Sequence, residues 1–400
     1  MSDLHKLLLS RVSQHEKVLG LGSLAEEESS DSSIESTNQP PHLQPPIPVN
    51  SSYQRSIDNQ PSTLTPPDDE EIFESYQSAK LGIFPVHEMY NSFQTYYKPP
   101  TSSREPIFIC HHGAGSSSMT FAVLTQALDS QWKRESGTSD GSPGVFAFDA
   151  RGHGLSQSHE TEDYTLSTLT DDFKFVLDRF IEIHKPSSSL YFIGHSLGGA
   201  VLTNYLNIHS HLTVKGLVML DIVEETAVKA LVAMPQFIKR RPTSFQNYQR
   251  AIDWHIKETG LLHNLASARI SVPDLLIRPS KSSPLFWRTD LNVTQPFWET
   301  WFKGLSSNFI TCGQVNKTAK LLILSGHENL DTDLIIGQMQ GKYQLIAFNN
   351  TQNAGHFIHE DIPSQISISL VDFVRRNDSP EEYMKNELGF VPKWGGKINK

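Results

Sequence analysis

The sequence predicts an α/β protein with a mainly parallel central sheet and helices on both of its faces. Short apolar runs of strand length alternate with longer segments in which apolar residues recur at helical spacing. Such an alternation is typical of parallel strands joined by crossover helices. The expected strands are 84–90, 92–97, 107–110, 144–149, 190–194, 214–221, 321–325 and 343–348. The expected helices include 168–184 and 198–208, with another that begins over 121–128.

The expected domain occupies 73–378 and is flanked by two segments of different character. Residues 1–72 are rich in acidic residues, serine and proline, and contain too few apolar side chains to repay the entropy of ordering. We therefore expect this segment to be largely disordered. Residues 379–400 are expected to form a C-terminal tail.

A long insertion interrupts the alternation between the expected sixth and seventh strands. It covers about 224–320, and its pattern is largely helical. Open α/β sheets bind their ligands at the carboxyl ends of the strands. We therefore expect the insertion to form a helical lid over that edge of the sheet.

Composition limits the classes of function and the cellular compartments that we expect for this protein. The formal net charge of −10 over 400 residues argues against a nucleic-acid partner. Only two cysteines occur, so no disulfide framework is expected, and an intracellular compartment, cytoplasmic or nuclear, fits this usage. No apolar run reaches the length of a membrane span, so no membrane partner is expected. We also expect the free protein to be a monomer. The first twelve residues weakly resemble a mitochondrial presequence, an alternative against which Asp3 and Glu16 count.

Residues 194–198, Gly-His-Ser-Leu-Gly, match the Gly-x-Ser-x-Gly pattern of a nucleophile elbow. Gly194 and Gly198 permit a sharp turn from strand to helix, and this turn exposes Ser196 at the N-terminus of the helix. The motif follows an apolar strand and opens a helix, which is the context that it requires. The sequence therefore predicts the α/β-hydrolase fold with Ser196 as the nucleophile.

A second glycine turn follows the strand 107–110 and reads His111-His-Gly-Ala-Gly-Ser. A His-Gly turn at this place supplies one backbone N–H to an oxyanion hole, and the residue after the nucleophile supplies another. We assign these two donors to Ala114 and Leu197, with Gly113 as the glycine that shapes the turn.

The general base and its acid partner are expected on loops late in the fold. Asn353-Ala-Gly-His356 follows the last strand, so His356 is the predicted base, with His359 as a competitor one turn further on. The acid is either Asp331, after the seventh strand, or Asp221, at the tip of the sixth. Both positions can reach a histidine on the final loop, and spacing alone leaves the choice open.

No cofactor and no metal ion is expected. His153 and His195 have no metal-ligand partners at suitable spacing, and no glycine-rich phosphate loop is present. Both histidines are interpreted as parts of turns rather than as ligands.

The chain resembles the protein phosphatase methylesterases over roughly 85–376, insertion included. The phrases that carry this resemblance are Gly194-His-Ser-Leu-Gly-Gly, Leu220-Asp-Ile-Val-Glu-Glu-Thr-Ala, Arg240-Arg-Pro-Thr-Ser-Phe, Ala251-Ile-Asp-Trp, Asn264-Leu-Ala-Ser-Ala-Arg, Trp301-Phe-Lys-Gly-Leu-Ser, Ile336-Gly-Gln-Met-Gln-Gly-Lys-Tyr-Gln and Gly355-His-Phe-Ile-His-Glu-Asp. Generic hydrolases share the first phrase but not those of the insertion.

The resemblance implies a reaction, a partner and an acid. The family removes the methyl ester from the C-terminal leucine of the type 2A protein phosphatase catalytic subunit, and so regulates phosphatase assembly. It implies binding to the tail and the active-site face of that subunit. It also places the acid at Asp221 rather than Asp331. Two other readings stay open: a generic small-ester or lipid serine hydrolase, and a phosphatase-binding regulator whose hydrolase site is incidental.

Overall fold

The computed structural model describes residues 69–136, 141–157, 162–209, 212, 214–326, 330–348 and 354–378. The expectations for 1–68 and for the tail 379–400 therefore lie outside the described residues. The first described element is helix α2 (Asp69–Ile83), which begins before Phe73, where we expected the domain to start. Within the described ranges, no helix combines the length and the apolar character needed to cross a lipid bilayer.

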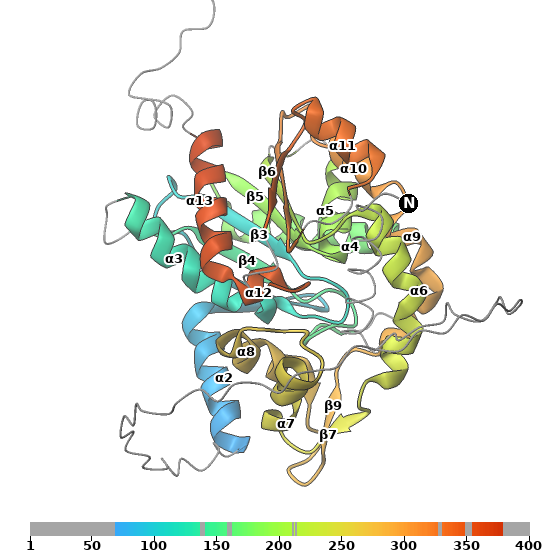
Figure 1. Ribbon diagram of the computed structural model, residues 1–400. Coiled ribbons are helices and arrows are strands. Elements are labelled where there is room, and N and C mark those ends of the chain that lie inside the picture. The colour runs from blue at the N-terminus through green and yellow to red at the C-terminus, as the bar shows by residue number, and fades with distance from the viewer. Residues whose placement is uncertain are drawn as a thin grey trace, which may run out of the picture. The chain divides into compact units, whose positions relative to one another are not determined.

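The domain is built on an eight-stranded sheet, which confirms the predicted α/β-hydrolase fold (Figure 1). Its strands are β1 (Val86–Tyr90), β2 (Phe93–Lys98), β3 (Ile107–His111), β4 (Gly144–Phe148), β5 (Leu190–His195), β6 (Val214–Leu220), β10 (Ala319–Leu324) and β11 (Gln344–Ala347). The order across the sheet is β1-β2-β4-β3-β5-β6-β10-β11. The pairs β1–β2 and β2–β4 are antiparallel and every other pair is parallel, so the sheet is mainly parallel as predicted.

Two hydrophobic cores lie on opposite faces of this sheet, because successive residues of a strand point to opposite sides. In β3, Ile107 and Ile109 belong to one core, whereas Phe108 and Cys110 belong to the other. Strands buried on both faces are expected to be apolar throughout, which is why they were visible in the sequence as continuous runs.

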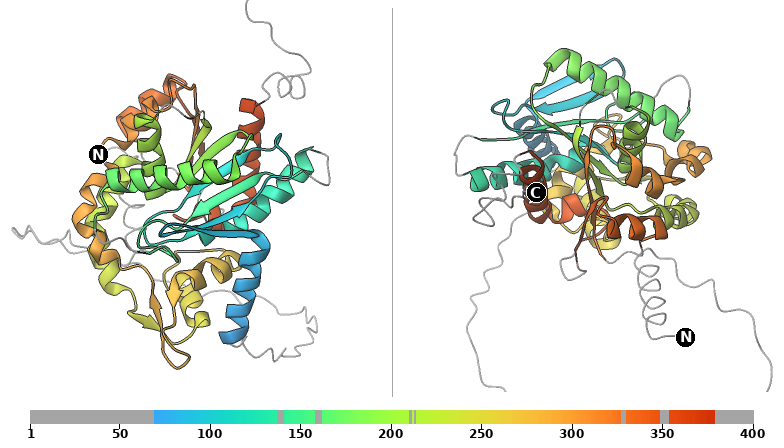
Figure 2. Two further views of the ribbon diagram at one scale, coloured as in Figure 1. Left: turned by 180° about the vertical axis from the view of Figure 1, so that it is seen from behind. Right: turned by 90° about the horizontal axis from the view of Figure 1, so that it is seen from above.

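Helices cover both faces, as predicted (Figure 2). The first core is closed by α4 (Leu166–His184) and α5 (Leu197–Ile208), and the second by α3 (Ala122–Ser136) and α13 (Pro363–Asp378). In α4 the apolar residues Leu169, Phe173, Val176, Leu177 and Phe180 are all buried. Their helical spacing is the signal that predicted this helix.

The insertion occupies the chain between β6 and β10, the sixth and seventh strands of the sheet in chain order. Its elements are α6 (Glu224–Arg240), β7 (Ser244–Phe245), α7 (Tyr248–Asp253), a π-helical turn η2 (Trp254–Glu258), α8 (Leu265–Asp274), β8 (Leu276–Ile277), β9 (Leu285–Trp287), a 3₁₀ helix η3 (Leu291–Phe297), α9 (Glu299–Phe302) and α10 (Leu305–Thr311). The strands β7, β9 and β8 form a small antiparallel sheet, which the largely helical expectation did not include. These strands have only two or three residues each, too few for a visible alternation. That the insertion acts as a lid stays a prediction.

Helix α2 is joined to the insertion by a buried ion pair and by hydrogen bonds. Lys80 Nζ lies 2.8 Å from Asp274 Oδ1, and both side chains are almost fully buried. Tyr76 donates a hydrogen bond to the same carboxylate oxygen. The carboxyl group of Asp69 accepts the backbone N–H of Tyr248 at 2.6 Å. A buried charge is tolerated only when it is paired and hydrogen-bonded, so these contacts hold α2 and the insertion in a defined arrangement.

A second buried carboxylate joins the insertion to the helix α12 (Ile358–Asp361). Glu360 is 2 % exposed. It accepts hydrogen bonds from the hydroxyls of Ser267 at 2.8 Å and Ser271 at 2.6 Å, both in α8. The Thr120 hydroxyl also donates to it. Burial raises the pKa of Glu360 from 4.5 to about 7, although the three hydroxyls oppose the shift.

We expect Glu360→Gln to remove a pH dependence of stability. The folded protein binds an extra proton between about pH 4.5 and about pH 7, so its free energy of unfolding falls as the pH rises through this interval. The fall contributed by this group is on the order of 3 kcal/mol. Glutamine has no charge to desolvate and can still bind the hydroxyls.

The measurement is urea unfolding of the parent and the variant at pH 5 and pH 8, with Glu299→Gln as an exposed control. The variant should gain stability relative to the parent only at pH 8. An equal difference at both pH values would contradict the burial of a titrating Glu360.

Candidate active site

Ser196 lies at the sharp turn between β5 and α5, in the position that the motif predicted. Its backbone has φ +51° and ψ −121°. This positive φ is uncommon for a residue with a side chain and marks a strained turn. A Cβ on Gly198 would lie 2.1 Å from the carbonyl oxygen of His111, and one on Gly194 would lie 2.5 Å from the Cα of Gly199. Both positions therefore require glycine if Ser196 is to stand at the tip.

The turn after β3 lies directly against the serine. A Cβ on Gly113 would lie 3.0 Å from the Cβ of Ser196, a tighter contact than side chains usually make, so glycine suits this approach. Ala114 follows it on the same loop. Leu197 is the first residue of α5, where backbone N–H groups have no partner within the helix. The two predicted oxyanion donors thus belong to segments that flank Ser196 on two sides.

Two buried histidines hold the loop that carries Ala114. The Gly115 N–H donates to His153 Nε2 at 2.9 Å, and the Nδ1–H of that ring donates to the Arg151 carbonyl at 2.8 Å. The Ala150 N–H donates to His112 Nε2 at 3.0 Å, and the Nδ1–H of His112 donates to the Gly113 carbonyl at 2.8 Å. The residues on either side of Ala114 are therefore fixed by ring nitrogens.

These contacts require neutral rings, because each Nε2 acts as an acceptor. Burial lowers the pKa of His153 to about 4 and lowers that of His112 well below its usual range. Both rings therefore stay neutral near pH 7. From the sequence, the His153 ring was expected only to form part of a turn, and no role was expected for the His112 ring; the repeated His-Gly pairs at 112–113 and 153–154 were the available signal.

Asp221 and His356 meet at the tip of β6. His356 Nδ1 lies 2.9 Å from Asp221 Oδ2, and Asp221 Oδ1 accepts the Ser325 N–H at 2.6 Å. The Asp221 side chain is 3 % exposed, whereas that of His356 is 47 % exposed. The carboxylate is therefore shielded from water, while the ring that it orients can meet a substrate. Asp221 also has a positive φ of 53°, so its backbone turns as sharply as that of Ser196.

The alternative residues make other contacts. Asp331 caps α11 (Thr332–Met339) by accepting the Leu334 N–H at 3.0 Å, and it also accepts the hydroxyl of Ser306. His359 is fully buried, with its Nε2 2.7 Å from the Thr120 hydroxyl. The structure thus brings Asp221 to His356, and it places Asp331 and His359 in contacts of a different kind.

The backbone of His356 is also held in place. His195, the neighbour of Ser196, lies with Nε2 2.8 Å from the His356 carbonyl oxygen, which can only accept, so the ring donates. Burial is the main cause that lowers the pKa of His195 well below its usual range. The residue beside Ser196 thereby ties the elbow to the loop that carries His356.

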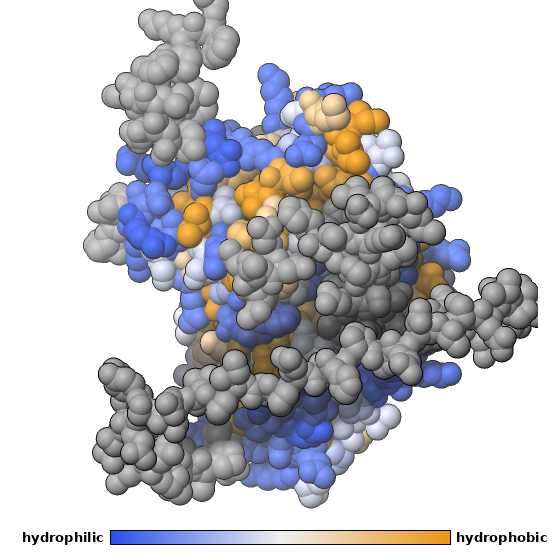
Figure 3. Space-filling view, viewed as in Figure 1, coloured by the Kyte–Doolittle hydropathy of each residue, from blue (hydrophilic) through white to orange (hydrophobic). Residues whose placement is uncertain are grey.

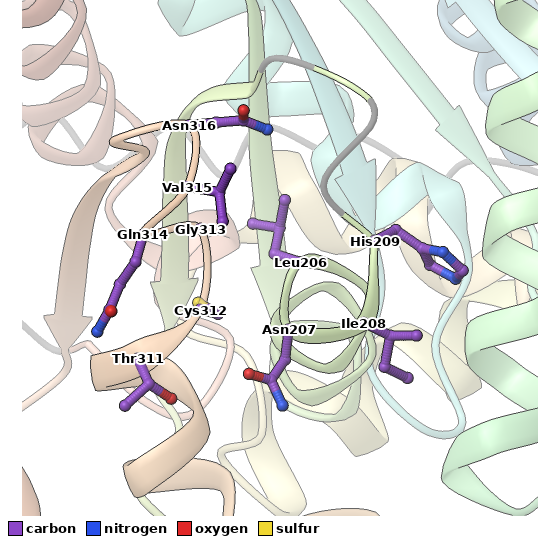
Figure 4. A pocket seen from close by; sticks show the side chains of 10 residues that line it. All are labelled: Leu206, Asn207, Ile208, His209, Thr311, Cys312, Gly313, Gln314, Val315 and Asn316. Atoms are coloured by element: carbon purple, nitrogen blue, oxygen red, sulfur yellow. The ribbon is translucent and has the colours of Figure 1, made fainter.

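Two pockets of about 260 Å³ each lie in the described part of the chain. One is lined by the C-terminal end of α5 and by the loop 311–316 (Figure 4). Ser196 precedes the other end of this helix, about 18 Å away for a helix of this length, so this pocket lies away from the candidate nucleophile. The second is lined by Arg241, Trp287 and Leu291 among others. Leu291 would lie 3.0 Å from a Cβ on Gly115, so this pocket borders the loop that carries Ala114.

The arrangement suits acyl transfer by a serine nucleophile. It offers a half-buried serine at the tip of a turn, a histidine oriented by a carboxylate, and two backbone N–H groups beside the serine. Among the described residues, no group of three or more His, Cys, Asp or Glu side chains could hold a metal ion.

Comparison with known proteins identifies the family. Residues 106–363 match the model of the alpha/beta hydrolase fold family. Proteins named Protein phosphatase methylesterase 1 are 55 % identical in Debaryomyces hansenii and 45 % identical in Candida albicans, each over 100 % of both chains. The Saccharomyces cerevisiae protein of that name is 40 % identical over 74 % of each chain.

Solved structures of hydrolases share the fold at low sequence identity. E-2-(acetamidomethylene)succinate hydrolase has a TM-score of 0.56 at 17 % identity, over 72 % of this chain and 98 % of that chain. An esterase of M. tuberculosis has a TM-score of 0.54 at 19 % identity, over 78 % of this chain and 99 % of that chain. With a full-length relative at 55 % identity and a hydrolase fold around the site, the chain belongs to the protein phosphatase methylesterase family of serine hydrolases.

Proposed function

We propose that this protein demethylates the C-terminal leucine methyl ester of the type 2A protein phosphatase catalytic subunit, releases methanol and thereby regulates phosphatase assembly. One observation carries the chemistry: His356 is hydrogen-bonded to the shielded Asp221, and its loop is tied to the elbow that presents Ser196. The relatives that share the whole chain support the substrate through their name. No cofactor is needed for this reaction.

In the first half of the proposed reaction, the Ser196 hydroxyl attacks the ester carbonyl. His356 accepts the hydroxyl proton at Nε2, while Asp221 holds Nδ1–H and stabilises the imidazolium that forms. The N–H groups of Ala114 and Leu197 bind the oxygen as its negative charge develops. Each such donor contributes about 3 kcal/mol in the transition state. His356 then returns the proton to the leaving methoxide, and methanol departs.

In the second half, water hydrolyses the acyl-enzyme along the same path. His356 takes a proton from the water, whose oxygen attacks the acyl carbonyl. Collapse of the second tetrahedral intermediate returns the proton to Ser196 and frees the carboxylate of the leucine. The partly exposed face of His356 allows both methanol and water to exchange with solvent.

We propose that this protein is a monomer when free and that it binds the tail and the active-site face of the phosphatase catalytic subunit. An exposed apolar surface supports a protein partner. On α11, Ile335, Ile336 and Met339 are 45 %, 47 % and 83 % exposed, and Figure 3 shows hydrophobic colour over this helix. Contiguous exposed apolar side chains are commonly found where proteins meet.

The first test is methanol release from purified, C-terminally methylated type 2A phosphatase. We expect Ser196→Ala to abolish release and Asp221→Asn to lower kcat by roughly 10³- to 10⁴-fold, because the ring loses its orienting acceptor. Asp331→Asn is the matched control, since asparagine also caps helices and Asp331 caps α11 through the Leu334 N–H.

Release by the parent and by Asp221→Asn, but not by Asp331→Asn, would overturn the assignment of the acid. Turnover of simple esters without release of methanol from the phosphatase would leave a serine hydrolase of another substrate class. Phosphatase binding without hydrolysis of any ester would leave a regulator that only binds its partner.

His153→Leu should lower kcat for ester hydrolysis by roughly 10- to 100-fold, because Gly115 loses its acceptor and Ala114 moves from its place. His153→Gln should retain more activity, since its carbonyl oxygen can accept the Gly115 N–H. His255→Leu is the matched control, because His255 is equally buried in the insertion and bonds to the Ala251 carbonyl. Equal losses in the two leucine variants, measured as kcat at pH 7, would show a general effect of packing.

A further inference from the structure

The sequence 355–361, Gly-His-Phe-Ile-His-Glu-Asp, ends in a buried carboxylate to which the proposed reaction gives no role. The side chain of Asp361 is 0 % exposed. Its Oδ2 accepts the backbone N–H of Gly355 at 2.8 Å. Gly355 directly precedes His356, so Asp361 bonds to the segment that carries the proposed general base.

The same carboxylate also binds the insertion. His263 donates its backbone N–H to Asp361 Oδ1 at 2.7 Å, and its Nδ1 lies 3.0 Å from Asp361 Oδ2. A Cβ on Gly355 would lie 3.1 Å from His263 Cε1, so the imidazole packs directly over the Gly355 backbone. One side chain therefore joins the insertion to the loop that carries His356.

A carboxylate is the group that these three contacts require. Both oxygens accept, and three N–H groups point at them, two from His263 and one from Gly355. An amide of the same shape has one oxygen and one NH₂ group, so at least one of these N–H groups would face another donor. A buried donor left without an acceptor is costly, and the loop would shift to avoid this cost.

Three contacts now define the place of His356. Asp221 holds the ring at Nδ1, His195 holds the carbonyl oxygen, and Asp361 holds the N–H of the preceding residue. The first acts on the side chain, and the other two act on the backbone. Of these three partners, only Asp361 is also bonded to the insertion.

We propose that Asp361 is a positioning residue that couples the place of the insertion to the place of His356, through His263 on one side and Gly355 on the other. This proposal rests on the proposed role of His356 as general base. A displacement of the 263–271 segment would pull on the carboxylate and, through it, on the backbone before His356. The insertion would then help to set the reactivity of Ser196 as well as enclose the substrate.

The neighbouring Glu360 supplies a matched control. It is buried on the same short helix and also bonds to the insertion, through Ser267 and Ser271 of α8. Its other bond is to Thr120, outside the insertion, whereas Asp361 bonds to Gly355. Glu360→Gln therefore alters a buried contact between α12 and the insertion without touching the loop of His356.

The experiment measures reaction of the full chain with a fluorophosphonate probe, which needs an activated Ser196 but no phosphatase. For Asp361→Asn we expect kinact to fall on the order of 10- to 100-fold with KI little changed, because the base is displaced while the probe site is kept. His263→Ala should show a smaller fall, and the double variant should be no slower than Asp361→Asn. Glu360→Gln should react like the parent.

A second readout separates positioning from loss of structure. The downfield ¹H NMR signal of the His356 Nδ1–H, bonded to Asp221, should broaden or shift upfield in Asp361→Asn and stay unchanged in Glu360→Gln. The unfolding midpoint of each variant is measured in parallel. Parent rates in Asp361→Asn, or equal losses in Asp361→Asn and Glu360→Gln, would overturn the coupling. A parent that does not react with the probe would instead overturn the proposed function.

Discussion

The close approach of three backbone segments around Ser196 is the constraint on which the site depends. Gly113, Gly194 and Gly198 each lie where a Cβ would press on a neighbouring atom, at 3.0, 2.5 and 2.1 Å respectively. Because Gly113 and Gly198 lack side chains, the turn after β3 can lie against the elbow, and the missing side chain of Gly194 lets the elbow itself fold tightly against Gly199. The proposed oxyanion donors and the proposed nucleophile therefore come together through backbone contacts, which a change of surface side chains would not alter.

Most of the fold and the elbow could be predicted from local sequence patterns, because these features depend on residues that are neighbours in the sequence. The strand expected at 190–194 is observed as Leu190–His195, and the elbow glycines predict the turn at Ser196 without any tertiary contact. The choice between Asp221 and Asp331 could not be made in this way. Both follow a strand at the same edge of the sheet, and only the path of each loop decides which carboxylate reaches His356. The short strands of the insertion and the contacts of Asp361 likewise depend on segments far apart in sequence.

Buried carboxylates connect the insertion to the rest of the domain, and each is bonded in a different way. Asp274 is paired with Lys80 of α2, Glu360 accepts three hydroxyls, and Asp361 accepts three N–H groups. Such groups are costly to separate, since each would leave an unpaired charge or unsatisfied donors. Hydrogen bonds and ion pairs are also directional, so these contacts define one placement of the insertion relative to the rest of the domain. Apolar packing alone specifies that placement less strictly.

The histidines around Ser196 differ in their access to water, and this difference separates their roles. Burial lowers the pKa of His111 and His153 to about 4 and that of His359 to about 3, while His112 and His195 lie well below their usual range. These rings stay neutral near pH 7, where four of them serve as fixed donors and acceptors for the backbone and His359 bonds to the Thr120 hydroxyl. His356 differs in two respects, because its ring is half exposed and it is bonded to a carboxylate. In the proposed reaction, a proton taken from Ser196 would therefore be held on His356 with Asp221 to balance its charge, whereas on any of the five buried rings it would be a desolvated cation.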